Sequence, residues 1–423
     1  MNLIRRAARH VALWVPAIRR VVEERNRLKE ENQLLREQKE PPVTARKFFR
    51  VHSGRPVEWA ADFDVDEGPF DVQLMGRIAS ACRSGAGRSQ PTGMWAEFTR
   101  HHSDIVSLLT EGRFDAASQY LKLQYGSRLT HGFQQGHNTY RHLAREASAR
   151  AHICRVHADR LLRLAETFGV IPIENPEQGE AGRGFDMDPD ELLRRIEVEF
   201  GARLDAPRWQ GGLFGLRTSR GIFTERHFAA VCLAKRISEI CPDRESRICE
   251  IGAGAGYVAY YCHKLGYHDF TIVDLPSVNI SQAYLLMRAM SGASFRLQGE
   301  PEPLEPGRSI RILADHALEN APSGCFDMVL NADSLPEMST ETATGVCKTI
   351  ARVARRFLSV NHETKLPRIG ASDLQERVPE ILLRVGGFQR MSRAPFWMRE
   401  GHVEELYAVD GVREGLSESS DDM

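Results

Sequence analysis

The spacing of apolar residues along the chain changes near residue 225. Before that point, apolar residues recur every three or four positions, which is the spacing of an amphipathic helix that buries one face. Five segments follow this pattern: 71–82, 95–110, 114–123, 140–168 and 189–200. Glycine-rich breaks separate some of them, as at 83–93 and 178–184. The pattern predicts an α-helical region over residues 43–225.

Beyond residue 225, short apolar and β-branched runs alternate with stretches of helical spacing. The runs lie at 247–251, 270–274, 310–314, 326–330, 357–360 and 405–409. Such alternation is typical of a parallel sheet whose strands are joined by crossover helices. We therefore expect a doubly wound, mainly parallel, Rossmann-like α/β domain over residues 226–412. The acidic, serine-rich end at 413–423 is expected to be a disordered tail.

A basic amphipathic segment opens the chain. Residues 3–22 contain five arginines, no acidic residue, apolar residues at helical spacing and a tryptophan, Trp14. Such a segment can lie on an anionic membrane surface, and a partner-binding or solvated helix is the open alternative. Apolar residues then recur every seven positions over 19–38, where Asn32 occupies a position that sets register in parallel dimers. Residues 1–42 are therefore expected to form a helix that either pairs two copies as a short coiled coil or stays single.

Composition narrows the class of protein. The formal net charge of -1 argues against a protein that coats nucleic acid, because such a protein needs a basic excess. The eight cysteines are scattered and form no Cys-x-x-Cys pair, so reduced thiols are expected rather than disulfides or a zinc knuckle. No apolar run reaches the roughly 18–20 residues of a membrane span. We expect a cytoplasmic protein, with peripheral contact at the inner face of the membrane as an open alternative.

A glycine-rich turn follows the first predicted strand of the C-terminal domain. Gly252, Gly254 and Gly256 are spaced G-x-G-x-G, and Glu250 precedes the first of them by two residues. Glycines at such a turn let a ligand approach the backbone closely. A dinucleotide fingerprint, G-x-G-x-x-G, would need a glycine where Tyr257 stands. Because Glu250 can meet the positively charged methionine end of S-adenosylmethionine (SAM), the turn predicts a SAM site formed by this carboxylate and the three glycines.

Polar residues also follow the next predicted strands, where ligands of doubly wound sheets bind. Asp274 ends its strand about 20 residues past the glycine turn, where a carboxylate accepts hydrogen bonds from a ribose diol. Asp315 follows the strand at 310–314 and is a candidate for the adenine amino group, with an N-cap of the next helix as a second role. Asn331, after the fourth of these strands, is placed toward the methyl donor.

Three motifs resemble those of the sugar O-methyltransferases of bacterial polysaccharide and surface-glycan clusters. They are CEIGAGAGY at 249–257, DLP at 274–276 with QAYL at 282–285, and FDMVLNADSLPEM at 326–338; LTHGFQQG at 129–136 is similar too. The strong part of the resemblance covers about residues 225–410. It implies a class I methyltransferase fold, SAM as the methyl donor, and a sugar hydroxyl of a polysaccharide or glycoconjugate precursor as the acceptor. It also implies that the motif at 326–338 lines the active site.

Methylation of a sugar hydroxyl requires a positioned base that removes the hydroxyl proton. Three candidates follow strands at the predicted active-site edge, and they are, in order of preference, His362, Asp333 and His316. Glu337 has two interpretations, because Ser334-x-x-Glu337 is also the pattern of a helix capping box. A divalent metal that orients the acceptor is compatible with the carboxylates of this region, but their spacing does not support one, and no metal ligand is assigned.

The sequence therefore predicts a SAM-dependent O-methyltransferase that acts on a sugar or glycan acceptor. Two alternatives are open. One is the same chemistry on another small-molecule or lipid acceptor, and the other is a membrane-docked SAM-binding adaptor without turnover. The helical region at 43–225 is expected to cap the acceptor or to provide a dimerisation surface.

Overall fold

In the computed structural model of the chain, the described residues all belong to one unit, which spans residues 51–423. The described residues are 59–62, 70–89, 91, 93–133, 145–173, 188–207, 211, 213–301, 306–365 and 374–410. The predicted N-terminal helix and coiled coil at 3–38 lie outside them, together with the membrane and dimer contacts expected of that helix, and so does the predicted tail at 413–423. Within the described part of the chain, none of the helices has the length and apolar character that crossing a bilayer requires.

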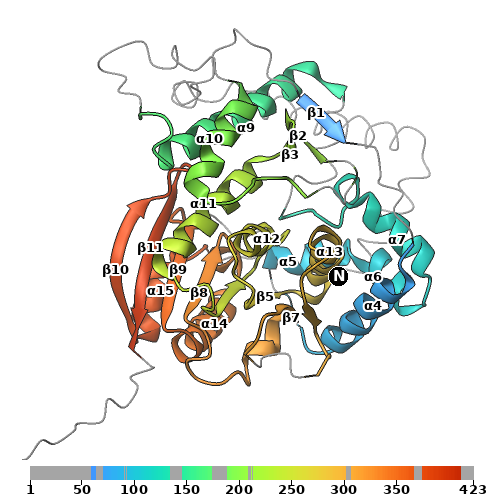
Figure 1. Cartoon of the computed structure of the whole chain (residues 1–423). Helices are drawn as coiled ribbons and strands as arrows, with labels where there is room; N and C mark the ends of the chain where they lie inside the picture. Colours follow the sequence, from blue (N-terminus) through green and yellow to red (C-terminus); the bar gives the residue numbers. More distant parts are fainter. Residues whose placement is uncertain are drawn as a thin grey trace, which may run out of the picture. The chain divides into compact units, whose positions relative to one another are not determined.

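An eight-stranded sheet forms the centre of this unit (Figure 1). Its strands are β4 (Ile248–Ile251), β5 (Phe270–Asp274), β6 (Phe295–Leu297), β7 (Ile310–Ala314), β8 (Met328–Ala332), β9 (Arg356–His362), β10 (Phe388–Pro395) and β11 (His402–Val409). Their order is β10-β11-β9-β8-β4-β5-β7-β6, and among these strands only β11 runs in the direction opposite to the others. The chain leaves β4 toward β5 and β7, then returns to β8 and β9 on the other side. This is the expected doubly wound, mainly parallel sheet, and its chain reversal beside β4 marks where ligands bind.

Alternate residues of the central strands enter two hydrophobic cores, one on each face of the sheet. Ile248 and Ile272 belong to the core under α11, α12 and α13, whereas Cys249 and Val273 belong to the core under α14 and α15. The bounds of these helices are α11 (Glu225–Ile240), α12 (Tyr257–Lys264), α13 (Pro276–Ala289), α14 (Thr340–Val353) and α15 (Val378–Val385). Because both faces are covered, the parallel strands are apolar runs rather than alternating patterns.

Helices from the first half of the chain pack onto the first of these cores. They are α4 (Val72–Ala86), α5 (Gly93–Arg100), α6 (Ser103–Thr110), α7 (Phe114–Lys122), α9 (Ala147–Thr167) and α10 (Pro189–Phe200). α4 packs against α13, and α9 packs against α11 (Figure 1). A small antiparallel sheet of β1 (Trp59–Asp62), β2 (Leu213–Thr218) and β3 (Gly221–Phe223) accompanies them, and α9 also contacts β1 and β2. The helical region thus shares one core with the large sheet and can contribute directly to a site on it.

Periodicity located the buried elements well and the exposed ones poorly. The predicted helix at 189–200 is α10, which Asp188 caps at its start and which Gly201 ends in a left-handed conformation. A single helix at 95–110 is wrong, because the chain breaks between α5 and α6. The small sheet β1–β3 and the strands β6 and β10 were not predicted. In β10 most side chains are exposed on both faces, so no apolar alternation marks this edge strand.

Three fully buried histidines make the fold sensitive to acid. Burial lowers the pKa of His102 and of His157 to about 4, and that of His227 to about 3. The Nδ1 atom of His157 accepts the Glu225 backbone N–H at 3.1 Å, and that of His227 accepts the Thr224 backbone N–H at 2.9 Å. These bonds need an unprotonated Nδ1, so the folded chain holds both rings in the neutral form.

We expect the free energy of unfolding to fall as the pH drops from 6.5 toward 4. In this range the unfolded histidines bind protons, because their ordinary pKa is 6.5, while the folded ones do not. The unfolded state therefore binds more protons, and each histidine contributes a slope of up to about 1.4 kcal/mol per pH unit. Urea denaturation between pH 7.5 and 5 measures the effect, and the slope should be smaller in His227→Asn. A midpoint that does not move over this range would contradict the expectation.

Candidate functional site

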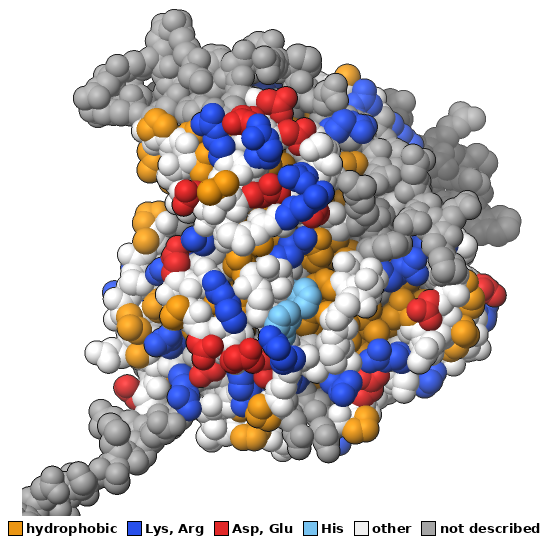
Figure 2. Space-filling model, viewed as in Figure 1, with side chains coloured by type: hydrophobic (Ala, Val, Ile, Leu, Met, Phe, Trp, Pro, Cys, Tyr) orange, Lys and Arg blue, Asp and Glu red, His pale blue; other side chains and the backbone are white. Residues whose placement is uncertain are grey.

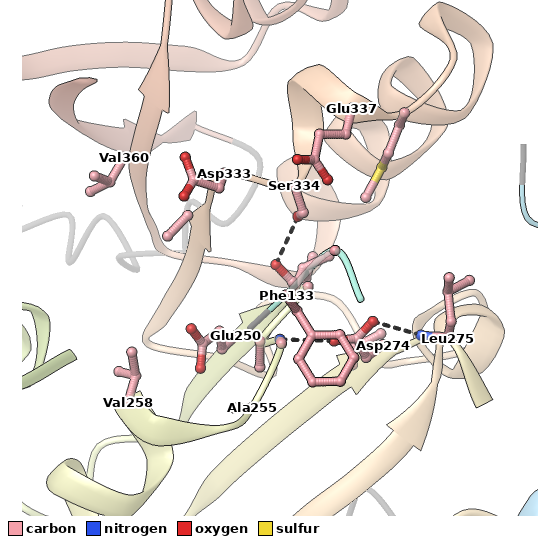
Figure 3. A pocket seen from close by; sticks show the side chains of 18 of the residues that line it. Phe133, Glu250, Ala255, Val258, Asp274, Leu275, Asp333, Ser334, Glu337 and Val360 are labelled. Atoms are coloured by element: carbon pink, nitrogen blue, oxygen red, sulfur yellow. Dashed lines mark hydrogen bonds between the residues drawn. The ribbon is translucent and has the colours of Figure 1, made fainter. Parts of the chain in front are cut away.

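A cavity of about 620 Å³ opens at the carboxyl ends of β4, β5 and β8 (Figure 3). The glycine turn between β4 and α12 contributes to its wall, and so do α11, the residues around β11, and parts of the helical region. The cavity lies where the chain reversal of a doubly wound sheet predicts a ligand site. Its volume falls within the range of roughly 300–1,000 Å³ that small-molecule sites occupy. On the face of the unit shown in Figure 2, acidic and basic side chains lie interspersed, in keeping with the net charge near zero.

The glycine turn depends on residues without side chains. Gly252, Gly254 and Gly256 have φ values of 74°, 56° and 75°. At Gly252 there is also no room, because an added Cβ would lie 2.2 Å from the Ser334 Oγ. Gly252 and Gly254 line the cavity. At Gly256 the space that a Cβ would take is instead filled by Leu286 of α13, so this glycine allows the helix to pack against the turn.

Glu250 is a buried carboxyl group beside this turn. Its side chain lines the cavity and is 3% exposed, and its Oε2 atom has no hydrogen-bond partner among the described residues. Burial, together with the nearby carboxylate of Asp274, raises the pKa of Glu250 to about 8. An unpartnered buried carboxyl group is costly, and a cationic ligand group beside it would relieve that cost. The position therefore suits the positive end of a ligand.

Asp274 closes the turn from the end of the neighbouring strand (Figure 3). Its Oδ2 accepts the Gly254 backbone N–H at 3.1 Å and the Gln282 side-chain amide at 2.9 Å, and its Oδ1 accepts the Leu275 backbone N–H at 2.8 Å. Burial raises the pKa of Asp274 to about 6, although these three bonds oppose the increase. Oδ1 has a single donor among the described residues, which leaves one lone pair available to a ligand hydroxyl group.

Asp315 and His316 line the cavity beyond the end of β7. Asp315 accepts a hydrogen bond from the Ser89 hydroxyl at 2.8 Å and one from the His316 backbone N–H at 3.1 Å. The alternative N-cap role of Asp315 is wrong, because Ala314 occupies that position before the short 3-10 helix η2 (Asp315–Leu318). β4 and β5 separate β7 from β8, so His316 follows a strand about 14 Å away from β8.

Asn331 is fully buried and does not reach the surface of the cavity. Its amide donates to the Ile251 carbonyl at 2.9 Å and to the Ser334 hydroxyl at 2.5 Å, while its Oδ1 accepts from the Asn361 amide at 3.1 Å. These bonds hold the segment after β8 against the glycine turn. The structure therefore gives Asn331 a supporting position and does not bring it to the cavity with the other predicted ligand residues.

Asp333 lies at the cavity among basic side chains. Its Oδ1 is 2.5 Å from the His402 Nε2, and its Oδ2 pairs with Arg226 at 3.2 Å and also with Arg399. Asp333 is the one described non-glycine residue with a positive φ, 68°. Aspartate tolerates this left-handed conformation better than most residues, and such strain is often found at functional sites. Both carboxylate oxygens are thus engaged by cationic or ring N–H groups.

His362 does not line the cavity, although it lies at the end of β9 as predicted. His402 of β11 pairs with it in register, with ring centroids 5.9 Å apart, and His402 is the histidine that reaches the cavity. The Nδ1 of His402 faces the Glu400 carbonyl at 3.1 Å, and its Nε2 faces Asp333. Both ring nitrogens are occupied, so this ring is suited to hold the carboxylate in place.

Glu337 projects into the cavity from the 3-10 helix η3 (Leu335–Glu337). Its Oε2 accepts the indole N–H of Trp95, from α5, at 2.9 Å. The capping-box interpretation is wrong, because the Ser334 hydroxyl makes no capping bond and contacts Asn331 and the Ile251 carbonyl instead. Burial raises the pKa of Glu337 to about 7.

Over the described ranges, no group of three or more His, Cys, Asp or Glu side chains is arranged to hold a metal ion.

Several cavity residues were not predicted from the sequence. From the helical region, Phe133 reaches the glycine turn and Trp95 reaches Glu337. Arg226 of α11, together with Arg399 and His402 near the C-terminal strands, surrounds Asp333. Among these residues only Phe133 belongs to a motif noted in the sequence, LTHGFQQG at 129–136. The others come from elements with no motif, and the fold alone brings them together.

No protein-family model and no curated protein sequence matches the chain. Similar solved structures include a protein of Pyrococcus horikoshii OT3, with 12% identity and a TM-score of 0.33, covering 42% of this chain and 87% of that one. Another is a magnesium protoporphyrin IX methyltransferase from Synechocystis PCC 6803 with bound SAM, with 15% identity and a TM-score of 0.31, covering 44% and 79%.

A third is a Burkholderia thailandensis 1,6-didemethyltoxoflavin-N1-methyltransferase with bound substrate and S-adenosylhomocysteine (SAH). It has 18% identity and a TM-score of 0.29, covering 44% of this chain and 78% of that one. The assignment of the fold rests on the strand order and register of the sheet itself.

Proposed function

We propose that this chain is a SAM-dependent methyltransferase. The observation that carries the proposal is the unpartnered buried carboxyl group of Glu250, which lies in a cavity beside the glycine turn, with Asp274 at the end of the next strand. SAM contains both groups that these carboxyls would bind: a cationic methionine end for Glu250 and a ribose for Asp274. The sheet order, with the antiparallel β11 between β9 and β10, is that of the class I methyltransferase fold that the sequence resembles.

The residues present fit SAM. Glu250 offers a carboxyl oxygen without a partner to the positive methionine end, and Gly252 leaves the backbone open where a side chain would collide with Ser334. Asp274 has a lone pair left for a ribose hydroxyl, and Asp315 lies at the side expected for the adenine amino group. When bound, SAM supplies an electrophilic methyl group.

The acceptor that we propose is a sugar hydroxyl of a polysaccharide or glycoconjugate precursor. The motif at 326–338, which resembles that of sugar O-methyltransferases, contributes Asp333, Ser334, Glu337 and Met338 to the cavity wall. Its carboxylates, with Arg226 and Arg399, provide the dense set of hydrogen-bonding groups that a polyhydroxylated ligand needs.

Two other functions make different predictions. Methylation of another small-molecule or lipid acceptor requires the same donor site, whereas a SAM-binding adaptor requires no turnover. We also retain as proposals a homodimer and a peripheral membrane contact through the N-terminal helix. Incubation of the full chain with methyl-labelled SAM and a panel of UDP-glucose, GDP-mannose and methyl glucosides separates these functions. Label transfer to a sugar is expected, and transfer to no sugar in the presence of normal SAM binding would contradict the sugar proposal.

We expect SAM binding at pH 7 to release protons. Glu250 is largely protonated at that pH, because burial raises its pKa to about 8. A cation beside this group favours the carboxylate and lowers the pKa, so a proton leaves when the ligand binds, and the affinity rises with pH up to about 8. Calorimetric titrations in buffers with different ionisation enthalpies measure the number of protons released. A release that persists unchanged in Glu250→Gln would contradict the assignment.

A further inference from the structure

We propose that Glu337 is the general base of the reaction and that Trp95 positions it. The inference rests on the proposed methyltransferase function and extends it to a catalytic residue. Glu337 follows β8, the strand whose carboxyl end lies beside the glycine turn, and its side chain lines the cavity. In Figure 3 its carboxylate lies on the side of the cavity opposite Glu250 and Asp274, the two groups assigned to the donor. A base facing the acceptor is needed at that position.

The hydrogen bonding of Glu337 leaves it free to accept a proton. Its Oε2 accepts the indole N–H of Trp95 at 2.9 Å, and no described residue donates to its Oε1. One oxygen is therefore fixed in direction while the other retains its lone pairs. Trp95 belongs to α5, so the helical region sets the orientation of a group on the sheet domain. This gives that region a role in the reaction besides covering the cavity.

Asp333, another cavity carboxylate on this side, is poorly suited to accept the proton. Both oxygens of Asp333 are engaged, one by His402 and the other by Arg226 and Arg399. A carboxylate held by two guanidinium groups and a ring nitrogen loses basicity, because each contact stabilises its charged form. Asp333 is better placed to hold the two arginines in position than to take a proton.

The histidines are excluded by position or by their partners. His362 does not line the cavity, and His316 follows β7, two strands beyond β4 and on the side assigned to the nucleoside. His402 lines the cavity, but its Nδ1 faces the Glu400 carbonyl and its Nε2 faces Asp333, so neither nitrogen is free. Glu337, in contrast, combines access to the cavity with an uncommitted lone pair.

The surroundings of Glu337 also keep its proton affinity in the useful range. Burial raises its pKa to about 7, against the opposing effects of the Trp95 N–H and of Arg226 from α11, while the carboxylate of Asp274 from β5 adds to the increase. A base whose pKa lies near the working pH transfers protons most efficiently. At neutral pH about half of the molecules then hold Glu337 as a carboxylate.

The methyl transfer breaks one bond at the methyl carbon and forms another. The acceptor hydroxyl gives its proton to Oε1 of Glu337, and its oxygen lone pair forms the bond to the methyl carbon. The carbon–sulfur bond breaks, and its electron pair stays on sulfur, which becomes the neutral thioether of SAH. The proton on Glu337 leaves to water before the next cycle.

Glu337→Gln tests the base in the full chain. The amide keeps the shape and can still accept from Trp95, so SAH binding measured by calorimetry should change less than threefold. Label transfer to any sugar that the wild type methylates should fall by about 100-fold or more. At saturating SAM, the rise of the wild-type kcat/KM for the acceptor with pH, with a midpoint near 7, should disappear. Glu341→Gln, an exposed carboxyl in the first turn of α14, is the matched control and should behave as wild type.

An infrared titration gives a readout that needs no acceptor. The carboxyl band of the wild type and of Glu341→Gln should contain a component that titrates near pH 7, between those of Asp274 and Glu250, and this component should be missing in Glu337→Gln. Trp95→Phe removes the N–H donor and should move both this midpoint and the kcat/KM midpoint to higher pH, which a merely structural role would not do. A Glu337→Gln enzyme with wild-type rate and pH profile, or with this component intact, would overturn the inference. A wild type that binds neither SAM nor SAH would instead overturn the proposed function.

Discussion

Replacing Gly252 by alanine should abolish SAM binding and lower the free energy of unfolding by about 3 kcal/mol. Two physical effects combine at this position. The left-handed backbone, with φ of 74°, disfavours any residue with a Cβ, and that Cβ would lie 2.2 Å from the Ser334 Oγ. Ser334 cannot move freely, because its hydroxyl bonds to Asn331 and to the Ile251 carbonyl. The turn must therefore shift, and the ligand loses its backbone surface.

Two variants separate these effects, with unfolding followed by urea denaturation and binding by calorimetry with SAH. Gly76→Ala, at an α4 position with nothing within 4 Å of an added Cβ, is the control and should be neutral or stabilising by up to about 1 kcal/mol. Gly252→Ala combined with Ser334→Gly removes the collision and should recover part of the stability, leaving the backbone strain. Unchanged stability and SAH affinity in Gly252→Ala would show that position 252 tolerates a Cβ, contrary to the prediction.

Asp274→Ala should weaken SAM binding by about a thousandfold, which corresponds to about 4 kcal/mol. The carboxylate has two tasks that alanine cannot perform. It accepts from the Gly254 backbone, the Leu275 backbone and the Gln282 amide, and so holds the turn against α13. It also offers a remaining lone pair to a ribose hydroxyl, and bonds to charged groups contribute about 1.5–3 kcal/mol each.

Calorimetric titration with SAM measures the loss, and a thermal melt reports whether the fold survives. Asp243→Ala is the matched control, because this aspartate accepts the Glu245 backbone N–H before β4, at the opposite end of that strand. Asp274→Asn should be intermediate, since one amide oxygen can still accept from backbone N–H groups. Full affinity in a folded Asp274→Ala protein would remove this residue from the donor site.

Much of the sheet domain could be predicted because its strands are buried on both faces. The runs at 270–274 and 310–314 coincide with β5 and β7, since a parallel strand between two helical layers is apolar throughout. The edge strand β10 and the small sheet β1–β3 could not be found in this way. Most side chains of β10 are exposed, so it shows no apolar alternation, and β1 pairs with β2 more than 150 residues later in the chain.

The residues proposed for the donor side could be predicted from the sequence, whereas those proposed for the acceptor side could be predicted only in part, through the motif at 326–338. Glu250 lies in β4 and Asp274 ends β5, each within one motif, so spacing alone brings them to the same edge of the sheet. Trp95 and His402 instead reach the cavity from elements about 300 residues apart, and no local pattern marks either. The prediction of His362 did not foresee the antiparallel strand β11, which places His402 rather than His362 at the cavity.

Calorimetric titration of the full chain with SAM and with SAH tests the central claim most directly. We predict saturable binding of both ligands at one site per chain, lost in Gly252→Ala and Asp274→Ala and retained in Gly76→Ala and Asp243→Ala. A cooperatively folded wild-type chain that binds neither ligand at millimolar concentration would contradict the account.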